Sequence, residues 1–352
     1  MLPQLQKALF YTFGALTLAS LGGAGYSYYC ASKAPASTKQ IAKKPSGLFS
    51  PLANESSEMD LTLNPTNDNA LETNIPGQLH ILFLGADKRS PSQSSYRTDS
   101  IMLVSILKDE KRALLTSIPR DLWLGGTKIN AHFCNEGFDP FKERISKVLG
   151  IEPDYYISTG FEGFVWSLDQ LGKIEPNIKR SFTDTNYPAD RPNAPHPPNF
   201  QAGVQTLTPE EALMYCRSRK GTNGEGSDFQ RMRRQQNLMV SLPGTFKNSN
   251  LFKLTAEALY NLFIGRIQTN MGVGDASRLL PIVKDWENYE IENLVLDTNN
   301  YLVHPPMSEY GGAYVLTPRT GSFDEIKEIV QAKLNGTFTE PAQPSSCSTC
   351  GN

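Results

Sequence analysis

Three short apolar runs between residues 80 and 118 constrain the fold of this 352-residue chain more than any other feature. They are residues 80–85 (HILFLG), 100–107 (SIMLVSIL) and 113–118 (ALLTSI). Continuous apolar runs of this length are typical of strands that are buried on both faces. The polar segment KDEK at 108–111 predicts a hairpin between the second and third runs, so we expect these two strands to be antiparallel.

Charged residues stand at one end of each predicted strand. If the strands run up, down and up, then the end of the first, the start of the second and the end of the third share one edge of the sheet. Asp87, Asp99 and Arg120 occupy these three places. The geometry therefore predicts that two carboxylates and a guanidinium converge. The alternative is that each is only a polar residue at a strand end.

A stretch at 215–236, YCRSRKGTNGEGSDFQRMRRQQ, contains five arginines around a glycine-rich turn. Arginine presents a planar fork of donors that matches two phosphate oxygens at once. Arg217 and Arg219 would point the same way in an extended segment, and Arg231 lies on the same face of a predicted helix as Gln235. We expect an anion site here, and a solvated basic surface is the alternative.

The overall composition limits the class of partner. The net charge is -2, with 20% charged residues, so nucleic acid is not an expected partner.

Five cysteines are too few and too scattered for a disulfide scaffold. Cys134 and Cys216 are expected to be two buried thiols, with a disulfide between them as the alternative. The CxxC at Cys347 and Cys350 is a weak signal for zinc or for redox chemistry.

The N-terminal segment predicts a membrane anchor. Residues 8–29 contain no charge and are long enough to cross a bilayer as a helix, roughly 33 Å at the usual helical rise. A cleaved signal peptide is the alternative, but its apolar core is usually shorter. Four lysines between residues 33 and 44 would place the following part in the cytoplasm by the positive-inside rule.

Further elements follow from local patterns. Residues 140–149 and 158–171 predict helices, and the second carries apolar residues at helical spacing, which indicates either core packing or a lipid groove. Thr208 and Glu211 predict a capping box, as do Ser322 and Glu325. The long proline-rich loop at 181–200 is a candidate for a functional role. Beyond residue 245 we expect helices near 251–265 and 273–286, strands near 290–297 and 312–317, and a closing helix.

Six motifs occur in an order that resembles the LytR-CpsA-Psr family of bacterial cell-envelope enzymes over residues 79–240. They are GADKR at 85–89, RTDSIMLVSI at 97–106, SIPRD at 117–121, KINA at 128–131, FQAGVQTLTPEEALMYCRSR at 200–219 and DFQRMRRQQ at 228–236. Two positions depart from the family pattern: Gln230 stands where glycine is usual, and GKIE at 172–175 replaces a more usual pair of glycines.

The resemblance implies an α/β fold with three layers, α/β/α, and a central mixed, largely antiparallel sheet that covers a hydrophobic pocket for a polyprenyl chain. One N-terminal transmembrane helix would precede it, with the N-terminus in the cytoplasm and the catalytic domain outside, which overrides the lysine count. The expected parts are a cytoplasmic tip and anchor (1–30), a flexible stalk (31–78), the catalytic domain (79–240), a C-terminal part of the folded region (241–336) and a disordered tail (337–352).

The implied activity is transfer of a phosphoglycan from a polyprenyl-pyrophosphate carrier onto peptidoglycan, which forms a phosphodiester and releases polyprenyl phosphate. Expected partners are that lipid-linked glycan, the peptidoglycan acceptor and the membrane. A polyprenyl-pyrophosphate hydrolase would use the same groups with water as acceptor. A non-catalytic lipid-carrier sensor or regulator of the cell envelope is a third reading.

The resemblance also implies roles for individual residues. Asp87 and Asp99 correspond to carboxylates near Mg²⁺, an ion that proteins hold with oxygen ligands and substrate phosphates. Asp99, Arg120 and Asp87 are the expected catalytic residues, and Asp99 is the preferred acceptor of the proton from the attacking hydroxyl. Asp121 would orient the arginines. The groups expected to hold the pyrophosphate are Arg89, Arg120, Arg217, Arg219, Arg231, Arg234 and Gln235.

Overall fold

The computed structural model describes residues 77–88, 93, 96–190, 195–263 and 265–338. The predicted membrane helix at 8–29 lies outside the described residues, as do nearly all of the predicted stalk and tail. Across the described part of the chain, no helix is both long enough and apolar enough to cross a bilayer.

The three apolar runs form three neighbouring antiparallel strands, as predicted. They are β1 (Gln78–Ala86), β2 (Thr98–Leu107) and β3 (Arg112–Ser117). Gly85 pairs with Ser100, and Met102 pairs with Ser117. The end of β1, the start of β2 and the end of β3 therefore meet at one edge of the sheet.

Three further strands complete a six-stranded sheet in the order β11-β6-β1-β2-β3-β12. β6 (Tyr155–Thr159) is parallel to β1, and β12 (Glu290–Val295) is parallel to β3. β11 (Gln268–Thr269) is antiparallel to β6. The predicted mixed sheet is confirmed. Because β11 and β12 belong to it, residues after 245 complete the same sheet.

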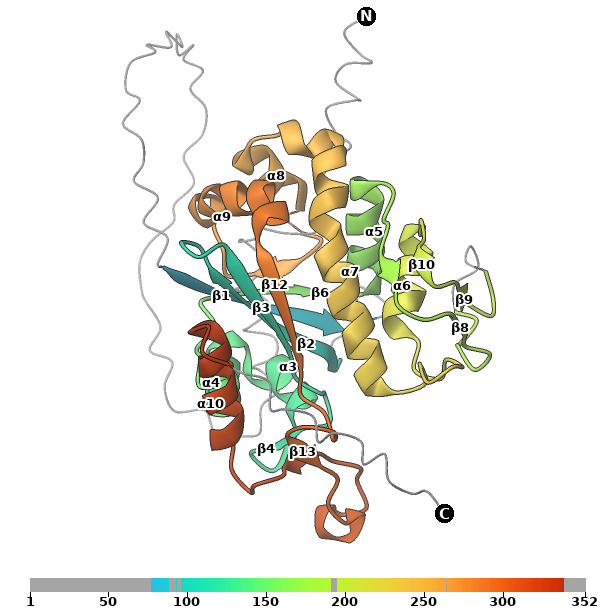
Figure 1. The fold of residues 1–352 in the computed structure, drawn as a ribbon, viewed down its shortest axis with the longest axis vertical. Coiled ribbons are helices and arrows are strands. Elements are labelled where there is room, and N and C mark those ends of the chain that lie inside the picture. Colours follow the sequence, from blue (N-terminus) through green and yellow to red (C-terminus); the bar gives the residue numbers. More distant parts are fainter. Residues whose placement is uncertain (1–76, 89–92, 94–95, 191–194, 264, 339–352) are drawn as a thin grey trace, which may run out of the picture.

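Helices cover both faces of the sheet (Figure 1). On one face, Leu82, Leu103 and Leu114 pack in a cluster with α4 (Phe138–Leu149) and α10 (Asp324–Leu334). On the other face, the alternate residues Ile81, Val104 and Leu115 pack toward α9 (Val273–Asp285) and α7 (Asp228–Asn248). This alternation is the two-residue period of a strand that is buried on both sides.

Helix α7 (Asp228–Asn248) lies along the sheet and is attached to it by a buried amide. The Gln236 side chain donates to the backbone oxygens of Leu115 and Leu294, and to Ser117 Oγ, at 2.9–3.0 Å. Hydrogen bonds of this kind remove the cost of burying a polar group. They fix the first turns of α7 beside the edge where Asp99 and Arg120 lie.

The remaining elements are short or lie around the sheet. The helices are α3 (His132–Glu136), α5 (Phe161–Leu171), α6 (Pro209–Arg217), α8 (Ala256–Phe263), α9 (Val273–Asp285), η2 (Ile129–Ala131), η3 (Asn250–Lys253), η4 (Trp286–Asn288) and η5 (Met307–Tyr310). The two-residue strands are β4 (Trp123–Leu124), β5 (Thr127–Lys128), β7 (Asn177–Ile178), β8 (Phe182–Thr183), β9 (Asn199–Phe200), β10 (Gly203–Val204), β13 (Leu302–Val303) and β14 (Thr317–Pro318).

The two predicted capping boxes have different outcomes. The Thr208 box is confirmed, since Thr208 Oγ1 accepts from the Glu211 backbone N–H and the Glu211 carboxylate accepts from the Thr208 N–H. The Ser322 box is wrong: α10 has no side-chain cap, and the Glu325 carboxylate is bound by Arg319. The strand predicted near 312–317 is confirmed only at its end, where Leu316 forms a bridge with Leu122 and β14 begins at Thr317.

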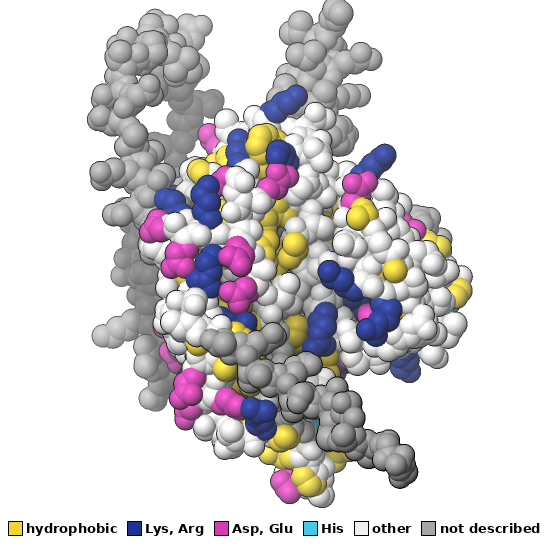
Figure 2. All heavy atoms as spheres, viewed as in Figure 1, with side chains coloured by type: hydrophobic (Ala, Val, Ile, Leu, Met, Phe, Trp, Pro, Cys, Tyr) yellow, Lys and Arg dark blue, Asp and Glu magenta, His cyan; other side chains and the backbone are white. Residues whose placement is uncertain are grey.

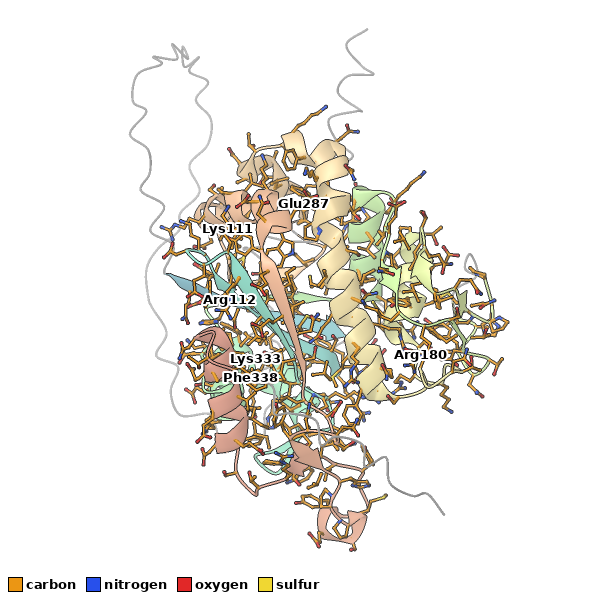
Figure 3. The ribbon with its side chains drawn as sticks, in the orientation of Figure 1. Lys111, Arg112, Arg180, Glu287, Lys333 and Phe338 are labelled. Atoms are coloured by element: carbon orange, nitrogen blue, oxygen red, sulfur yellow. The ribbon has the colours of Figure 1, made fainter. Side chains whose placement is uncertain are left out.

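Charged side chains hold α10 against the β3–β12 edge of the sheet (Figure 3). Arg112 forms an ion pair with Glu292 at 3.0 Å and donates to the backbone oxygens of Lys333 and Leu334 at the end of α10. The Lys333 ammonium also binds Glu292, at 3.1 Å. A cation is favourable at a helix C-terminus because the last carbonyls carry partial negative charge.

Candidate functional site

A cavity of about 700 Å³ lies between the sheet and helices α5, α6, α7 and α8. Its interior is apolar, and its wall comes from β1, β2, β6 and the four helices. Cavities of this size and character hold small molecules or lipid chains. The apolar lining is Phe83, Leu84, Met102, Ile157, Phe161, Phe164, Leu168, Leu213, Leu238, Met239, Leu242, Phe263 and Ile267.

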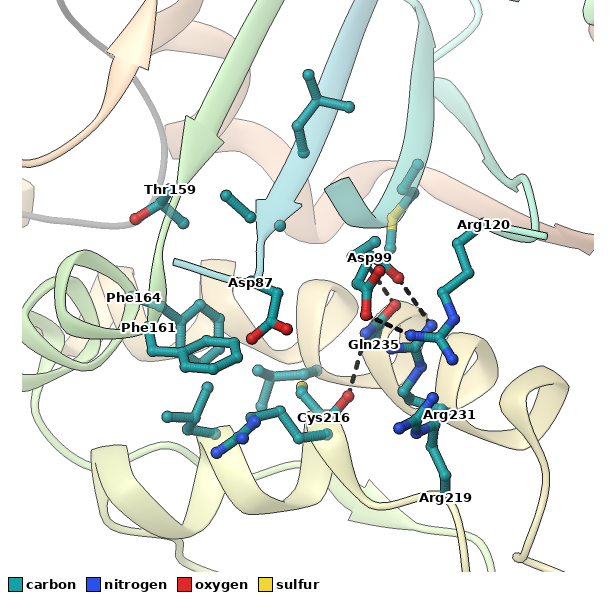
Figure 4. Close-up of a pocket in the computed structure, with 18 of the residues that line it drawn as sticks. Asp87, Asp99, Arg120, Thr159, Phe161, Phe164, Cys216, Arg219, Arg231 and Gln235 are labelled. Atoms are coloured by element: carbon teal, nitrogen blue, oxygen red, sulfur yellow. Dashed lines mark hydrogen bonds and ion pairs between the residues drawn. The ribbon is translucent and has the colours of Figure 1, made fainter. Parts of the chain in front are cut away.

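One end of the cavity is polar. Asp87 directly follows β1, Asp99 is the second residue of β2, and Arg120 lies just after β3. All three line the cavity. Figure 4 shows the two carboxylates entering the same space, with Arg120 and Arg231 beside Asp99. The predicted convergence at one sheet edge is confirmed, and it follows from the antiparallel pairing of β1, β2 and β3.

The Asp99 carboxylate is fixed on both oxygens. Arg120 Nη1 donates to Oδ2, and Asn130 Nδ2 donates to Oδ1 at 3.2 Å. Asn130 comes from the KINA segment and lies in η2, immediately after β5. Asp121, the neighbour of Arg120, forms an ion pair with Lys128 at 2.5 Å and lies 3.5 Å from Arg120 Nε. Asp121 thus contacts the arginine that it was expected to orient.

Asp228 at the start of α7 connects three arginines. Its carboxylate lies 3.0 Å from Arg231 Nη2, 3.7 Å from Arg120 Nε and 3.9 Å from Arg219 Nη1. Arg231 Nη2 also donates to the Asp99 backbone oxygen at 2.7 Å. The side chain of Arg219 is 47% exposed at the cavity mouth, whereas that of Arg231 is only 6% exposed.

The pKa values of Arg231 and Arg120 shift in opposite directions. Burial lowers the pKa of Arg231, and the nearby Arg120 adds to this effect despite the Asp228 charge. Burial also acts to lower the pKa of Arg120, but the Asp99, Asp228 and Asp121 charges outweigh it and raise that pKa. Arg120 Nε, Arg231 Nε and Asp228 Oδ1 are buried without a hydrogen bond. Such polar atoms are costly unless a ligand meets them.

Arg217 ends α6 and its side chain diverges from that of Arg219, so the extended geometry expected for this pair is wrong. Its guanidinium binds Asp190 through two hydrogen bonds at 3.0 and 3.2 Å, and Nη1 donates to the Tyr187 hydroxyl at 2.8 Å. It also lies 4.1 Å over the Phe161 ring. Arg217 therefore lines the cavity at the point where aromatic and charged walls meet.

The structure does not bring Arg234 into the lining of the cavity. The guanidinium is buried and donates to the backbone oxygens of Tyr215, Glu225 and Ser218, and to the Glu225 carboxylate at 2.7 Å. It holds the turn between α6 and α7 together, because its donors are used within the protein. Arg234 lies three positions after Arg231 on α7, and the sequence motif does not display that its guanidinium turns toward Glu225.

Two predicted pyrophosphate groups remain, Gln235 and Arg89. Gln235 lines the cavity, but its amide accepts from Ser100 Oγ at 2.9 Å and donates to the Cys216 oxygen at 3.1 Å. Arg89 lies outside the described residues. Cys134 and Cys216 are both buried thiols, as predicted, and burial raises the pKa of Cys216 to about 12.

Two residues of the site were missed at the sequence level. Asp228 was not assigned a role, although its helix spacing places it on the same face of α7 as Arg231 and Gln235. Asp184, in the proline-rich loop, is 2% exposed and accepts from Ser218 Oγ and from the backbone N–H groups of Arg219 and Lys220 at 2.6–3.2 Å. It fixes the turn that carries Arg219. The length of the loop was the only signal that could have pointed to it.

The apolar side chains of α5 are divided between the wall of the cavity and the buried core. Phe161, Phe164 and Leu168 line the cavity, whereas Leu171 packs in a buried cluster with α7 and α8. A single helix thus carries a cavity wall on one side and core residues on the other.

The polar end offers oxygen ligands for a hard cation. Within the described residues, no group of three or more His, Cys, Asp or Glu side chains is placed to hold a metal by itself. Asp87 and Asp99 nevertheless line one rim, and Asp228 Oδ1 there has no hydrogen bond. Because Mg²⁺ is usually held by one or two carboxylates together with substrate phosphates, this donor set fits the ion.

Comparison with known proteins gives one family. A model of the LytR_cpsA_psr family matches residues 47–332. The polyisoprenyl-teichoic acid–peptidoglycan teichoic acid transferase TagV of Bacillus subtilis is 26% identical over 266 residues, which cover 73% of this chain and 65% of TagV. The regulatory protein MsrR of Staphylococcus aureus is 31% identical over 203 residues, 55% of this chain and 57% of MsrR. The chain thus spans less than two thirds of either relative.

Solved structures share the fold. The crystal structure of B. subtilis TagV aligns with a TM-score of 0.55 and 24% identity, over 73% of this chain and 97% of TagV. A structure of the family protein YwtF (TagT) with bound octaprenyl pyrophosphate lipid aligns with a TM-score of 0.51 and 21% identity, over 74% and 91% of the two chains. These likenesses establish a mixed α/β fold with a central mixed sheet.

Proposed function

The chain belongs to the LytR_cpsA_psr family, and we propose that it is a membrane-anchored transferase that moves a phosphoglycan from a polyprenyl-pyrophosphate carrier onto peptidoglycan. The observation that carries the proposal is the two-part cavity: an apolar interior ends at a rim of arginines and carboxylates. A lipid with a pyrophosphate head is divided in the same way, into an apolar chain and a charged group. The relative named as a teichoic acid transferase and the related structure with a bound polyprenyl pyrophosphate support it.

The rim residues provide positioning and charge. Arg120, Arg219 and Arg231 are proposed to bind the pyrophosphate oxygens, because guanidinium groups match phosphate geometry and their charge opposes the charge that develops on the leaving group. Asp228 holds the three arginines together, and Arg217 joins the rim to the aromatic wall. In phosphoryl transfer most of the rate enhancement comes from such placement.

The proposed reaction breaks one bond and forms one. The acceptor sugar hydroxyl attacks the phosphorus next to the glycan, the bond from that phosphorus to the bridging oxygen breaks, and polyprenyl phosphate leaves with the electron pair. Asp99, held by Arg120 and Asn130, accepts the proton of the hydroxyl. Asp87 and Asp99 would hold Mg²⁺, which when bound neutralises charge on the pyrophosphate.

The proposal includes a place in the cell. Residues 8–29 would cross the membrane once, with the N-terminus in the cytoplasm and the cavity outside, where peptidoglycan lies. The support is the uncharged run of apolar residues at 8–29. The donor lipid would then remain in the same bilayer as the anchor.

Two other functions would use the same rim. A hydrolase would pass the phosphoglycan to water. A regulator would bind the lipid without turnover. The relative MsrR, which is named a regulatory protein, favours this function.

The test uses the purified full-length chain in detergent with a lipid-pyrophosphate-linked glycan, Mg²⁺ and isolated peptidoglycan. Glycan that becomes covalently bound to the wall, and that is lost in Asp99→Asn, supports transfer. Soluble glycan phosphate with none on the wall points to hydrolysis instead. Binding of the donor without any product would identify a regulator.

A further inference from the structure

The segment between β13 and β14 projects from the lower end of the molecule (Figure 1), and its Tyr314 lines the cavity. Its return strand is hydrogen-bonded to the segment that follows Arg120: Leu316 O accepts from the Trp123 N–H at 2.8 Å, and the Leu316 N–H donates to Asp121 O at 3.0 Å. Leu302 and Leu316 are buried in the core cluster at its two ends. This projection is therefore hydrogen-bonded to the segment that follows Arg120 at the polar end of the cavity.

Aromatic rings gather on this projection. Trp123 and Tyr310 contact edge to face at 5.2 Å, and His304 and Tyr314 contact at 4.3 Å. We call these four side chains the aromatic ledge. Tyr314 is 43% exposed and also lines the cavity, so the ledge is continuous with the site. Burial raises the pKa of Tyr314, and the charges of Asp121 and Asp228 add to this effect.

The chemistry of the ledge is neutral and amphipathic. Residues 302–317 contain one acid, Glu309, and neither lysine nor arginine. Val303 and Met307 are also exposed, at 43% and 45%. Figure 2 shows hydrophobic side chains at the lower end of the molecule, where the segment projects. The segment itself therefore supplies no cation for a phosphate or an anionic lipid headgroup. Lys128, which pairs with Trp123 across β4 and β5, is bound by Asp121.

We infer that the aromatic ledge binds the acceptor, a chain of uncharged, β-linked amino sugars, and delivers its hydroxyl to the rim. The inference rests on the proposed function, since it names the acceptor surface of the same site. It is carried by the continuity of Tyr314 with the cavity, by the backbone bonds of Leu316 to Asp121 and Trp123, and by the absence of positive charge in the segment.

The fit to a sugar chain follows from the properties of the rings. One face of a pyranose ring presents only C–H groups, and these pack on the negative face of an aromatic ring while the hydroxyls stay hydrated. The Tyr hydroxyls and the His304 ring add polar partners at the edges. Insertion into a bilayer is the competing use of exposed Tyr, Trp and Met side chains, and it becomes an outcome of the test.

The test is a titration of the full-length protein in detergent with a soluble oligomer of β-linked N-acetylglucosamine, followed by tryptophan fluorescence. Trp123→Phe identifies the part of the signal that comes from the ledge. Tyr310→Ala and Tyr314→Ala are each expected to weaken binding about 5-fold, while Tyr310→Phe restores it. Val204→Ser, at an exposed position on β10, is the matched control and should not change oligosaccharide binding.

Binding of the lipid-pyrophosphate donor by Tyr310→Ala separates this inference from the proposed function. Weaker oligosaccharide binding with unchanged donor binding supports the ledge. Wall transfer that proceeds while neither alanine variant affects oligosaccharide binding overturns the ledge and leaves the transferase standing. Ring-dependent binding without any transfer supports the ledge and overturns the transferase. A Trp123 signal that responds to neutral phosphatidylcholine vesicles, and not to oligosaccharide, assigns the ledge to the bilayer and overturns it.

Discussion

The guanidinium of Arg120 forms an ion pair with the carboxylate of Asp99, although the two residues lie 21 positions apart in the sequence. The pair exists because β2 and β3 are antiparallel neighbours, so that the start of one strand lies beside the end of the other. Asp228 approaches the same guanidinium from α7. One arginine thus connects the sheet edge with the arginine-rich helix.

Arg120→Ala is expected to reduce kcat for transfer by about 10²–10³-fold, because it removes a donor aimed at the developing charge. Arg120→Lys should restore only part of the activity, since an ammonium lacks the planar fork of a guanidinium. Steady-state assays of wall-bound glycan measure both. The control is Arg144→Lys, whose side chain binds Glu136 away from the cavity. Full transfer by Arg120→Ala would exclude the proposed role.

Arg234 and Arg219 should behave in opposite ways. Arg234→Met leaves the buried Glu225 carboxylate without its ion pair, which typically costs about 3–5 kcal/mol and would lower Tm by about 10 °C. Arg219→Met, at a half-exposed position, should leave Tm nearly unchanged but weaken donor binding. Thermal melts and donor titrations measure the contrast. Replacing Glu225 by Leu in the Arg234→Met protein should recover part of the lost stability; no recovery would argue against the ion pair as the cause.

The apolar interior should select donors by chain length. Met239→Trp places a larger side chain in the cavity wall, so affinity for a long polyprenyl donor is expected to fall about 10-fold while a donor with a very short chain binds as before. The neighbouring Val240 is exposed and does not line this cavity, so Val240→Trp is the matched control. Equal losses for short and long donors would place the lipid chain elsewhere.

Asp184 should make stability depend on acid pH. Burial acts to raise its pKa, but hydrogen bonds from Ser218 and from the backbone of Lys220, Arg219 and Asn186 outweigh this and lower the pKa. A lowered pKa contributes stability above the unfolded value of about 3.9, and this contribution is lost as the pH falls through the folded value. Urea midpoints of the wild type should therefore fall more steeply below about pH 4 than those of Asp184→Asn. Parallel pH profiles would contradict this account.

The sequence predicted the half of the site that depends on strand order. A hairpin between two apolar runs is a local signal, and once β1, β2 and β3 are antiparallel, the positions of Asp87, Asp99 and Arg120 follow. The arginine-rich stretch at 215–236 indicated an anion site that includes Arg219 and Arg231, and the resemblance named the anion as a pyrophosphate. The structure brings both arginines to the same rim.

The rest depended on contacts between distant segments. Arg234 belongs to the same motif as Arg231 and lies three positions after it on α7, but its guanidinium binds Glu225, which lies outside the motif, and does not line the cavity. No sequence pattern around Asp184 or Asp228 indicates which arginines they contact. β6 (Tyr155–Thr159) was not predicted, and its last two residues were assigned to the helix expected at 158–171, whereas α5 begins at Phe161.

The most direct measurement follows the two phosphorus atoms of the donor separately. The full-length protein is given peptidoglycan, Mg²⁺ and a lipid-pyrophosphate-linked glycan labelled with ³²P either next to the glycan or next to the lipid. Transfer predicts that the glycan-side label becomes covalently bound to the wall and that the lipid-side label remains in polyprenyl phosphate, in equal amounts. Glycan-side label that stays soluble, with none in the wall, would contradict the proposed transfer.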